Sequence, residues 1–323
     1  MIYKRLGNTG LQVSGLCFGT MSFGGDADED TARALYTRCR DAGINFFDTA
    51  DMYNKGRSEE ILGRLAEGQR EELILASKGY FPTGEDRNQR GASRKHLQHA
   101  IEASLRRLRT SYIDIYFIHR FDDATPLEET LRGLEDLVRQ GKILYPAASN
   151  FAAWQVEKAL GIAARNCWAR MEVIQPMYNL VKRQAEVELL PMAAAENLGV
   201  MPYSPLGGGL LSGKYSAGQR PEHGRVIDNP IYQKRYGQEW VFAAAGAFSD
   251  FARSMGYHPA TLAVAWVASH PAVTAPIIGA RNPDQLEASL AAADLALGAD
   301  LRAEISALTP EPPPATDRSE ERA

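Results

Sequence analysis

The chain has 323 residues, of which 45% are hydrophobic and 24% charged, and its formal net charge is -4 at pH 7. This composition supports a large buried core, in either one large domain or two ordinary ones. The slight negative charge leaves no basic footprint for nucleic acid or an anionic membrane, which favours a small-molecule partner held by local charges.

Cysteine spacing and the N-terminal sequence indicate the compartment. Cys17, Cys39 and Cys167 lie far apart without a C-x-x-C pair, which is typical of a reducing compartment and of neither a disulfide framework nor a zinc site. The N-terminus has no apolar signal-peptide core, and no window approaches the ~18 apolar residues of a membrane span. We therefore expect a cytoplasmic protein without a disulfide framework or a cysteine zinc site.

The first predicted element is a β-hairpin, in which IYKRLG and LQVS flank the turn sequence NTG. Apolar strand-like runs then alternate with amphipathic helical windows. The predicted strands are residues 16–19, 44–47, 73–77, 113–118, 143–148, 173–175, 200–203 and 273–278. One helical window, RKHLQHAIEASLRRL, repeats leucine or isoleucine every three or four residues, and PLEETLRGLEDLVRQG has the same kind of apolar stripe. Both are predicted to be crossover helices.

Strands separated by helices favour parallel pairing, and the length fits a closed barrel with insertions. We therefore predict an α/β fold, a (β/α)8 TIM barrel with an N-terminal β-hairpin, as a single domain over residues 1–308. An open doubly wound sheet is the alternative, because periodicity does not reveal closure. The G-x-G-x-x-G fingerprint of dinucleotide-binding sheets is missing after the first strand, where the sequence reads CFGTMSFGG.

Two segments interrupt the alternation of strands and helices. Residues 214–238 are polar, rich in Gly and Pro, and too long for a structureless connector, so they are predicted to form a functional or mobile loop. Residues 309–323, TPEPPPATDRSEERA, contain four prolines and little to bury, so they are predicted to be a disordered Pro-rich tail.

Four polar side chains follow three successive predicted strands. Asp48 and Tyr53 follow the second strand, Lys78 the third, and His119 the fourth. The carboxyl ends of barrel strands converge on one mouth, so these groups are expected to meet there. A tyrosine has an unperturbed pKa near ~10 and needs neighbours that ease release of its proton. A lysine ammonium favours the phenolate, a histidine orients or relays the proton, and an acid keeps a buried lysine charged.

These residues lie in the segments FDTADMY with the following RSEEILG, then LASKG, then FIHR, which resemble the aldo-keto reductases in order and strand position. The resemblance runs from about residue 3 to residue 292. It implies NADPH-dependent reduction of an aldehyde or ketone, or the reverse alcohol oxidation, on a (β/α)8 barrel. Asp48, Tyr53, Lys78 and His119 would be the catalytic tetrad, with Tyr53 as proton donor, and no metal would be required.

The rest of the barrel mouth is expected to bind the cofactor. Ser149, Asn150 and Gln175 offer a hydroxyl and two amides, which suit the hydrogen-bonding pattern of a nicotinamide carboxamide. Tyr203 follows the seventh strand and can stack on the nicotinamide ring. In the structural alternative, Ser149 and Asn150 cap turns and Tyr203 packs in the core.

A glycine-rich segment, YSPLGGGLLSGKY, follows the seventh strand and is similar to the family's wording there. Its glycines let backbone N–H groups approach closely and form an anion-binding concavity near Lys214 that suits a pyrophosphate. After the eighth strand, IIGARNPDQLEASL leads into a helix whose N-terminus favours anions. Arg281 is placed to fork onto a 2'-phosphate, which would favour NADPH. Ser289 replaces the family's adenine-facing asparagine, which shortens or removes that contact.

The full predicted sets are larger than these examples. The cofactor-binding residues are predicted to be Gly19, Thr20, Ser149, Asn150, Gln175, Tyr203, Ser204, Pro205, Leu206, Gly209, Leu211, Lys214, Gly279, Arg281, Gln285 and Ser289. The substrate-binding residues are predicted to be Met21, Met52, Tyr80, Phe81 and Phe121, which favour an apolar or ring-shaped carbonyl compound.

Two other functions stay open. The barrel can be an NADPH-binding regulatory or sensor subunit with little turnover, like the family's channel-associated members. It can also be a metal-dependent hydrolase that uses Asp48, Asp51 and His119, although no His-x-His pair follows the first strand. Taken singly, a strand-end Asp commonly caps a helix and a lone Tyr commonly packs in a core. Loss of NADPH absorbance with a panel of aldehydes and ketones would separate an enzyme from a sensor.

Overall fold

The chain begins with a hairpin in which β1 (Tyr3–Arg5) pairs antiparallel with β2 (Gln12–Ser14). The computed structural model describes residues 1–316. Leu6 is fully buried, and the next residue, Gly7, is so close to Gly199 that a Cβ on Gly7 would lie 2.3 Å from the Gly199 nitrogen. Since Gly199 starts a strand, the hairpin packs against the amino-terminal end of the sheet.

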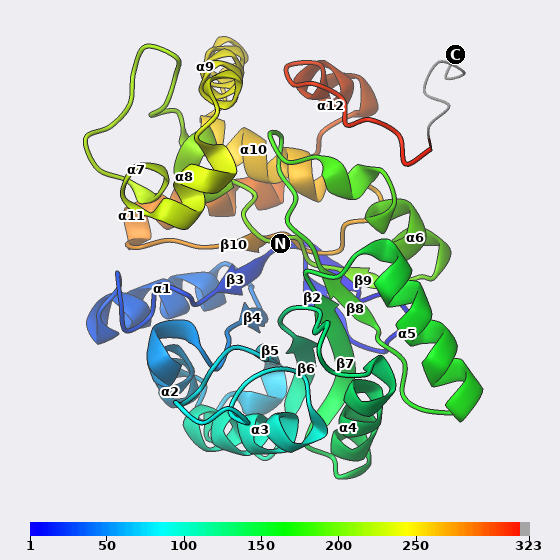
Figure 1. The fold of residues 1–323 in the computed structure, drawn as a ribbon. Coiled ribbons are helices and arrows are strands. Elements are labelled where there is room, and N and C mark those ends of the chain that lie inside the picture. The colour runs from blue at the N-terminus through cyan, green and yellow to red at the C-terminus, as the bar shows by residue number, and fades with distance from the viewer. Residues whose placement is uncertain (317–323) are drawn as a thin grey trace.

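Eight parallel strands form one sheet whose order follows the chain from β3 to β9, with β10 beside β3 (Figure 1). The strands are β3 (Cys17–Gly19), β4 (Phe46–Asp48), β5 (Ile74–Gly79), β6 (Ile113–Ile118), β7 (Ile143–Ser149), β8 (Val173–Gln175), β9 (Gly199–Val200) and β10 (Ile277–Ile278). Three backbone hydrogen bonds join its ends: Thr274 N–H and Ala275 N–H donate to Val200 O at 2.9 and 3.2 Å, and Ile277 N–H donates to Pro202 O at 2.8 Å. This closure confirms the predicted (β/α)8 barrel and excludes the open sheet.

The last two strands are shorter than the predicted runs 200–203 and 273–278. Each run contains a proline, Pro202 or Pro276, which has no N–H to donate to a ladder. The barrel is therefore closed by separate backbone hydrogen bonds on either side of these prolines.

Helices lie outside the barrel along most of its circumference (Figure 1). They are α1 (Glu29–Asp41), α2 (Arg57–Leu65), α3 (Arg94–Leu108), α4 (Leu127–Arg139), α5 (Ala153–Asn166), α6 (Leu189–Ala195), α7 (Arg225–Asp228), α8 (Pro230–Tyr236), α9 (Glu239–Ser254), α10 (Pro259–Ala268), α11 (Pro283–Leu290) and α12 (Ala299–Ser306). Helices α3 and α4 match the two windows predicted from periodicity. Side-chain caps fix several starts: the Ser93 hydroxyl accepts from His96 N–H, and the Asn282 amide oxygen accepts from Gln285 N–H.

Alternation along each strand decides which side chains enter the barrel. Successive strand residues point to opposite faces, so Phe46 packs inside the barrel while Phe47 packs outside against the helices. Asp48 therefore shares the inward face with Phe46. By the same parity, Lys78 follows the interior residue Ala76, His119 follows Phe117, Ser149 follows Ala147, Gln175 follows Val173 and Tyr203 follows Met201. All these polar residues thus project toward the barrel axis at its carboxyl end.

The two irregular segments differ in structure. Residues 214–238 are not structureless, because they contain α7 and α8. Residues 309–316 form no helix or strand, and the remainder of the predicted tail, residues 317–323, lies outside the described residues. Among helices within residues 1–316, none has the length and hydropathy needed to cross a membrane.

Candidate active site

The four predicted catalytic side chains meet at the carboxyl end of the barrel. Lys78 Nζ lies 2.7 and 2.6 Å from the two Asp48 carboxylate oxygens and 3.3 Å from Tyr53 OH. It also donates to the Thr49 carbonyl at 2.7 Å. The ring of His119 stands edge-on to the ring of Tyr53, with centroids 5.9 Å apart. The arrangement is an ion pair in contact with a phenol, beside an imidazole.

A tight turn after β4 positions Tyr53. Tyr53 N–H donates to Ala50 O at 3.1 Å, and the tyrosine opens the short 3-10 helix η1 (Tyr53–Gly56). The next residue, Asn54, has a positive φ of 48° and donates from its side chain to the carbonyls of Met21 and Phe23 at 2.9 and 2.7 Å. The loop after β3 therefore holds the loop after β4, and the phenol position depends on both.

Burial and nearby charges act in opposite directions on the pKa values of Tyr53 and Lys78. Burial raises the pKa of Tyr53 above its ordinary value, while the Lys78 ammonium pulls that pKa down. Burial alone would lower the pKa of Lys78, but the Asp48 carboxylate and the Tyr53 phenol raise it. At neutral pH the tyrosine is therefore protonated and the lysine charged, which is the state of a proton donor beside a cation.

His119 is a neutral imidazole at neutral pH. Burial, and then the Lys78 charge, hold the pKa of His119 well below its usual range. Its Nδ1 is buried and has no hydrogen-bond partner among residues 1–316. Phe81 packs edge-on against the ring with centroids 4.9 Å apart, which fixes the ring plane. The other ring nitrogen, Nε2, also makes no hydrogen bond among residues 1–316 and is not one of the buried atoms, so Nε2 is the nitrogen that can exchange a hydrogen bond with a ligand.

A chain of hydrogen bonds links the neighbouring strand ends. Gln175 Nε2 donates to Asp48 Oδ1 at 2.8 Å, and Ser149 Oγ donates to the Gln175 carbonyl at 3.0 Å. Asn150 Nδ2 donates to the His119 carbonyl at 2.9 Å, and Tyr203 OH donates to Asn150 Oδ1 at 2.8 Å. Burial raises the pKa of Tyr203 to about 12, so this donor stays protonated. Gln175 Oε1 accepts no hydrogen bond from residues 1–316, so it is the amide oxygen that remains available to a ligand.

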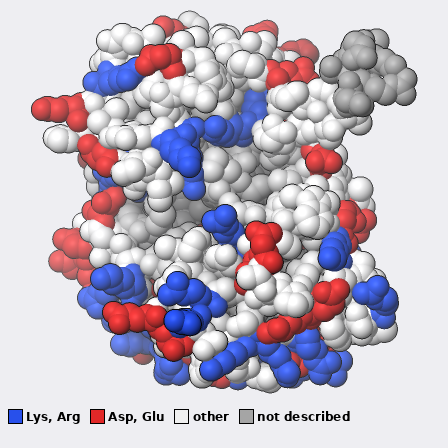
Figure 2. Space-filling model, in the orientation of Figure 1, with Lys and Arg blue, Asp and Glu red and all other residues white. Residues whose placement is uncertain are grey.

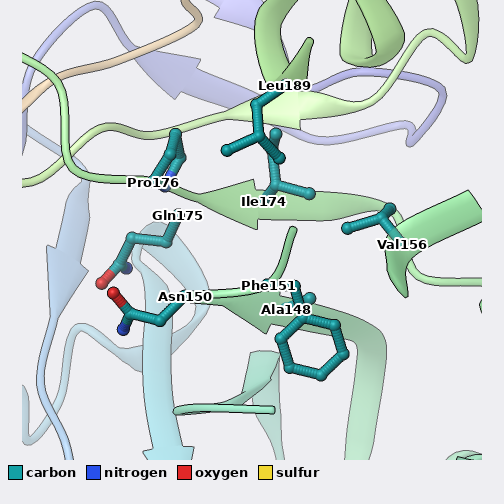
Figure 3. Close-up of a pocket in the computed structure, with 8 residues that line it drawn as sticks. All are labelled: Ala148, Asn150, Phe151, Val156, Ile174, Gln175, Pro176 and Leu189. Atoms are coloured by element: carbon teal, nitrogen blue, oxygen red, sulfur yellow. The ribbon is translucent and has the colours of Figure 1, made fainter. Parts of the chain in front are cut away.

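Figure 3 shows how Asn150 and Gln175 are oriented relative to their apolar neighbours. The two amides lie on the same side, whereas Ile174, Val156 and Phe151 gather on the other. The cavity between these residues holds only about 10 Å³, roughly one water molecule. It is too small for a substrate or a cofactor.

A much larger cavity of about 680 Å³ is lined by three of the four predicted catalytic residues, Asp48, Tyr53 and His119. In the space-filling view, the face shown in Figure 2 is hollowed at its centre, and Lys and Arg side chains gather along the upper edge of the hollow. Its volume is of the size that ligand and cofactor sites commonly have. It is therefore the candidate active site.

Most predicted residues line this cavity. Of the predicted catalytic and cofactor residues, the lining includes Asp48, Tyr53, His119, Gly19, Ser149, Asn150, Gln175, Tyr203, Ser204, Pro205, Leu206, Gly209, Lys214, Gly279, Arg281 and Gln285. Of the predicted substrate residues, it includes Met21, Met52 and Phe81. Lys78 does not line it, because this residue is fully buried behind Asp48 and Tyr53.

Five other predicted residues do not line the cavity. Thr20 is fully buried, and its hydroxyl contacts Ser58 Oγ at 2.8 Å. Leu211 and Ser289 are also fully buried, and the helix presents Ala288 to the cavity instead of Ser289. The remaining two are Tyr80, which packs on Phe81, and Phe121, which packs on Phe151 and Trp154.

Three cations form one group at the end of the cavity nearest α11. Arg281 pairs with Asp26 at 2.9 Å, and Arg225 lies 3.5 Å from the same carboxylate. Burial lowers the pKa of Lys214, and the charges of Arg281 and Arg225 lower it further. Gly209 lies beside Lys214, so that a Cβ on the glycine would be 3.8 Å from Lys214 Cε. These residues fit the phosphate groups of a dinucleotide.

Sequence reasoning missed several lining residues in the segment 214–238. Arg225 from α7 and Tyr232 and Arg235 from α8 all line the cavity. The available signal was the spacing of Tyr232 and Arg235, three residues apart and so on one helical face. Without a predicted helix in this segment, that spacing could not be interpreted.

The metal-hydrolase alternative finds little support in the contacts of its residues. Both Asp48 oxygens are bonded to Lys78. Asp51 is buried away from the cavity, its oxygens have no hydrogen-bond partner among residues 1–316, and burial and Glu59 raise its pKa to about 8. Across the described residues, no three His, Cys, Asp or Glu side chains form a group suited to a metal ion.

Comparisons with known proteins found similar sequences over most of the chain. The family model described as "Aldo/keto reductase family" matches residues 15–309. The chain is 38% identical to the uncharacterized oxidoreductase YrpG of Bacillus subtilis (strain 168), over 97% of each chain. It is 37% identical to a probable voltage-gated potassium channel subunit beta of Oryza sativa subsp. japonica, over 96% of this chain and 94% of the relative. It is 32% identical to versiconal hemiacetal acetate reductase of Aspergillus parasiticus, over 92% and 94%.

Proposed function

The chain belongs to the aldo/keto reductase family, and on that premise we propose that it reduces an aldehyde or ketone to the alcohol with NADPH. The family consists of oxidoreductases that generally use nicotinamide cofactors. The single observation that carries the proposal is the position of Lys78 Nζ, which touches both Asp48 oxygens and lies 3.3 Å from Tyr53 OH on the cavity floor. The reverse oxidation of an alcohol uses the same groups.

When bound, NADPH would supply a hydride for the carbonyl carbon. Tyr53 donates the proton to the carbonyl oxygen, because its raised pKa keeps it protonated across the neutral range. Lys78 stabilises the phenolate that remains, and Asp48 holds Lys78 charged through two short contacts. His119, fixed in plane by Phe81, orients the carbonyl oxygen by a hydrogen bond and carries no charge of its own.

Several residues are suited to hold the cofactor. Tyr203 offers a half-buried ring at the cavity wall, and Gln175 Oε1 offers a free acceptor for the amide of a carboxamide. Lys214, Arg225 and Arg281 offer positive charge for phosphate groups. Arg281 is exposed apart from its contact with Asp26, so its guanidinium is accessible to a 2'-phosphate. This last point supports NADPH over NADH.

The test is the variant Tyr53→Phe, which removes one oxygen and leaves the cavity shape intact. Loss of NADPH absorbance is followed with a panel of aldehydes and ketones, and NADPH binding is followed by quenching of tryptophan fluorescence. We expect kcat to fall by at least about 100-fold, the lower end of what general acid catalysis contributes, with unchanged NADPH binding. A variant that turns over at the wild-type rate would remove Tyr53 from its proposed role.

The second candidate is a cofactor-binding regulatory subunit with little turnover. The observation that favours it is the rice relative, named as a probable voltage-gated potassium channel subunit beta, which is 37% identical over nearly the whole chain. The same carbonyl panel decides between the two. A sensor would consume NADPH no faster than its own Tyr53→Phe variant with every compound, whereas an enzyme would exceed that variant with at least one.

A further inference from the structure

Besides the three cations grouped near α11, one more cation lines the cavity. Lys214, Arg225 and Arg281 form that group near Asp26, as described above. A fourth cation, Arg235, also lines the cavity. It makes no hydrogen bond or ion pair to any residue in the part of the chain that the structure describes. A partly buried guanidinium without a carboxylate needs another anion to offset its lost hydration.

Helix α8 fixes Arg235 at the end of the cavity where Tyr203 lies. The residue after Arg235, Tyr236, is fully buried, and its hydroxyl accepts from Asn179 Nδ2 at 3.2 Å. The same Asn179 Nδ2 donates to the Ser204 carbonyl at 2.9 Å, directly after Tyr203. The C-terminal end of α8 is therefore fastened to the segment that carries Tyr203. The charge of Arg235 also acts on Tyr203, where it opposes the rise in pKa that burial causes.

Tyr232 forms the wall next to Arg235. Its ring is near two guanidinium groups, with Arg225 Cζ and Arg235 Cζ each 5.6 Å from the ring centroid. It packs so closely on Gly208, whose φ is +72°, that a Cβ there would lie 2.6 Å from Tyr232 Cδ1. The hydroxyl of Tyr232 makes no hydrogen bond within residues 1–316. A free phenol and an unpaired guanidinium on one helical face can bind the two oxygens of one carboxylate.

Three apolar side chains of the lining also lie near Tyr53. Met21 and Met52 are each 39% exposed, and Phe81 packs on His119. This part of the cavity thus combines apolar surface with the positive charge of Arg235. A neutral substrate would fill the apolar part but leave Arg235 without a counterion.

We propose that Arg235, together with Tyr232, binds a carboxylate on the substrate, so that the preferred substrates are aldehydes or ketones bearing a carboxylate on an apolar or aromatic body. This inference rests on the proposed carbonyl reduction for its kinetic test. Its binding test stands apart from catalysis.

The kinetic test uses a matched pair of compounds, 4-formylbenzoate and its neutral methyl ester. We expect the wild-type protein to have the higher kcat/KM for the acid. In Arg235→Gln, kcat/KM for the acid should fall by about 10- to 100-fold, as for the loss of a hydrogen bond to a charged group, and the ester should change by less than about threefold. Lys234→Gln is the control, because Lys234 is exposed on the same helix and does not line the cavity.

The binding test measures 4-formylbenzoate by calorimetry on the protein saturated with NADP⁺. The acid should bind the wild type and the Lys234→Gln variant equally, and the Arg235→Gln variant about 10- to 100-fold more weakly. An Arg235→Gln variant that binds the acid normally would overturn the inference. So would a variant that loses affinity for NADPH instead, because Arg235 would then serve the cofactor.

The two tests separate the inference from the proposed function. A wild-type protein that reduces no compound of the carbonyl panel but binds the acid through Arg235 would contradict carbonyl reduction and leave the carboxylate site supported. A protein that reduces both compounds equally well, with or without Arg235, would support carbonyl reduction and contradict the carboxylate site.

Discussion

Replacing Lys78 by methionine removes the charge at the centre of the site. In the native protein Lys78 Nζ lies 2.7 and 2.6 Å from the Asp48 oxygens, and the two side chains are 0% and 4% exposed. Without the ammonium, the only side-chain donor left to Asp48 among the described residues is Gln175 Nε2. Breaking one side of a buried pair costs about 3–5 kcal/mol, and Lys78→Met should lower the free energy of unfolding by that much near neutral pH.

The titration of Asp48 decides how the stability cost of Lys78→Met changes with pH. Burial raises the pKa of Asp48 even with Lys78 present, and it raises it more strongly once the lysine is gone. A carboxyl with a folded-state pKa above its unfolded value destabilises the fold as pH rises through that range. The loss of unfolding free energy in Lys78→Met should therefore be largest at neutral pH, and it should shrink as pH falls and Asp48 is protonated.

The double variant Asp48→Asn/Lys78→Met completes the cycle. Because it leaves no unpaired buried charge, it should cost about as much as one single variant and less than their sum. Urea unfolding followed by tryptophan fluorescence at several pH values gives all four free energies. Strictly additive costs, with no pH dependence in Lys78→Met, would refute a buried charge pair at this site.

Two further predictions concern the cofactor and the proton donor. Arg281→Ala should raise the KM for NADPH by about 10-fold or more and change the KM for NADH by less than about threefold, since only NADPH offers a 2'-phosphate. An equal effect on both would show that Arg281 does not contact that phosphate. The kcat/KM for reduction should stay level through the neutral range and fall only above pH ~10, because burial raises the pKa of Tyr53 and the active form is protonated. Burial and Lys78 lower the pKa of His119, so no fall should occur near pH 7; a decline centred there would identify another acid.

The parts of the site on strand ends were predictable because strand parity is simple. Asp48, Lys78, His119 and Gln175 each follow an inward-facing apolar residue by two positions, and the barrel brings those positions together. The same parity explains the error at Thr20, because Cys17 faces inward and a residue three positions later points outward. Thr20 stands on a turn after β3, where its hydroxyl is turned to Ser58 rather than to the cavity.

Other errors arose where tertiary packing decides the outcome. Ser289 lies on α11, and only the packing of that helix shows that Ala288 faces the cavity while Ser289 is buried. Tyr232 and Arg235 reach the cavity because a segment read as a loop folds into α8 and is fastened back through Tyr236. Such a long-range contact has no signature in local periodicity.

The central claim is that the hydride and the proton reach the same carbonyl group, which lies beside the hydroxyl of Tyr53. It is tested most directly with NADPH carrying deuterium at both C4 positions, mixed with an aldehyde and either the wild-type protein or Tyr53→Phe. Mass spectrometry should find one deuterium on the carbinol carbon of the wild-type product. In the same time it should find at least about 100-fold less labelled alcohol from Tyr53→Phe, although that variant still binds NADPH. Labelled alcohol formed equally fast by both proteins, or NADPH oxidised by the wild type without label in the alcohol, would contradict the claim.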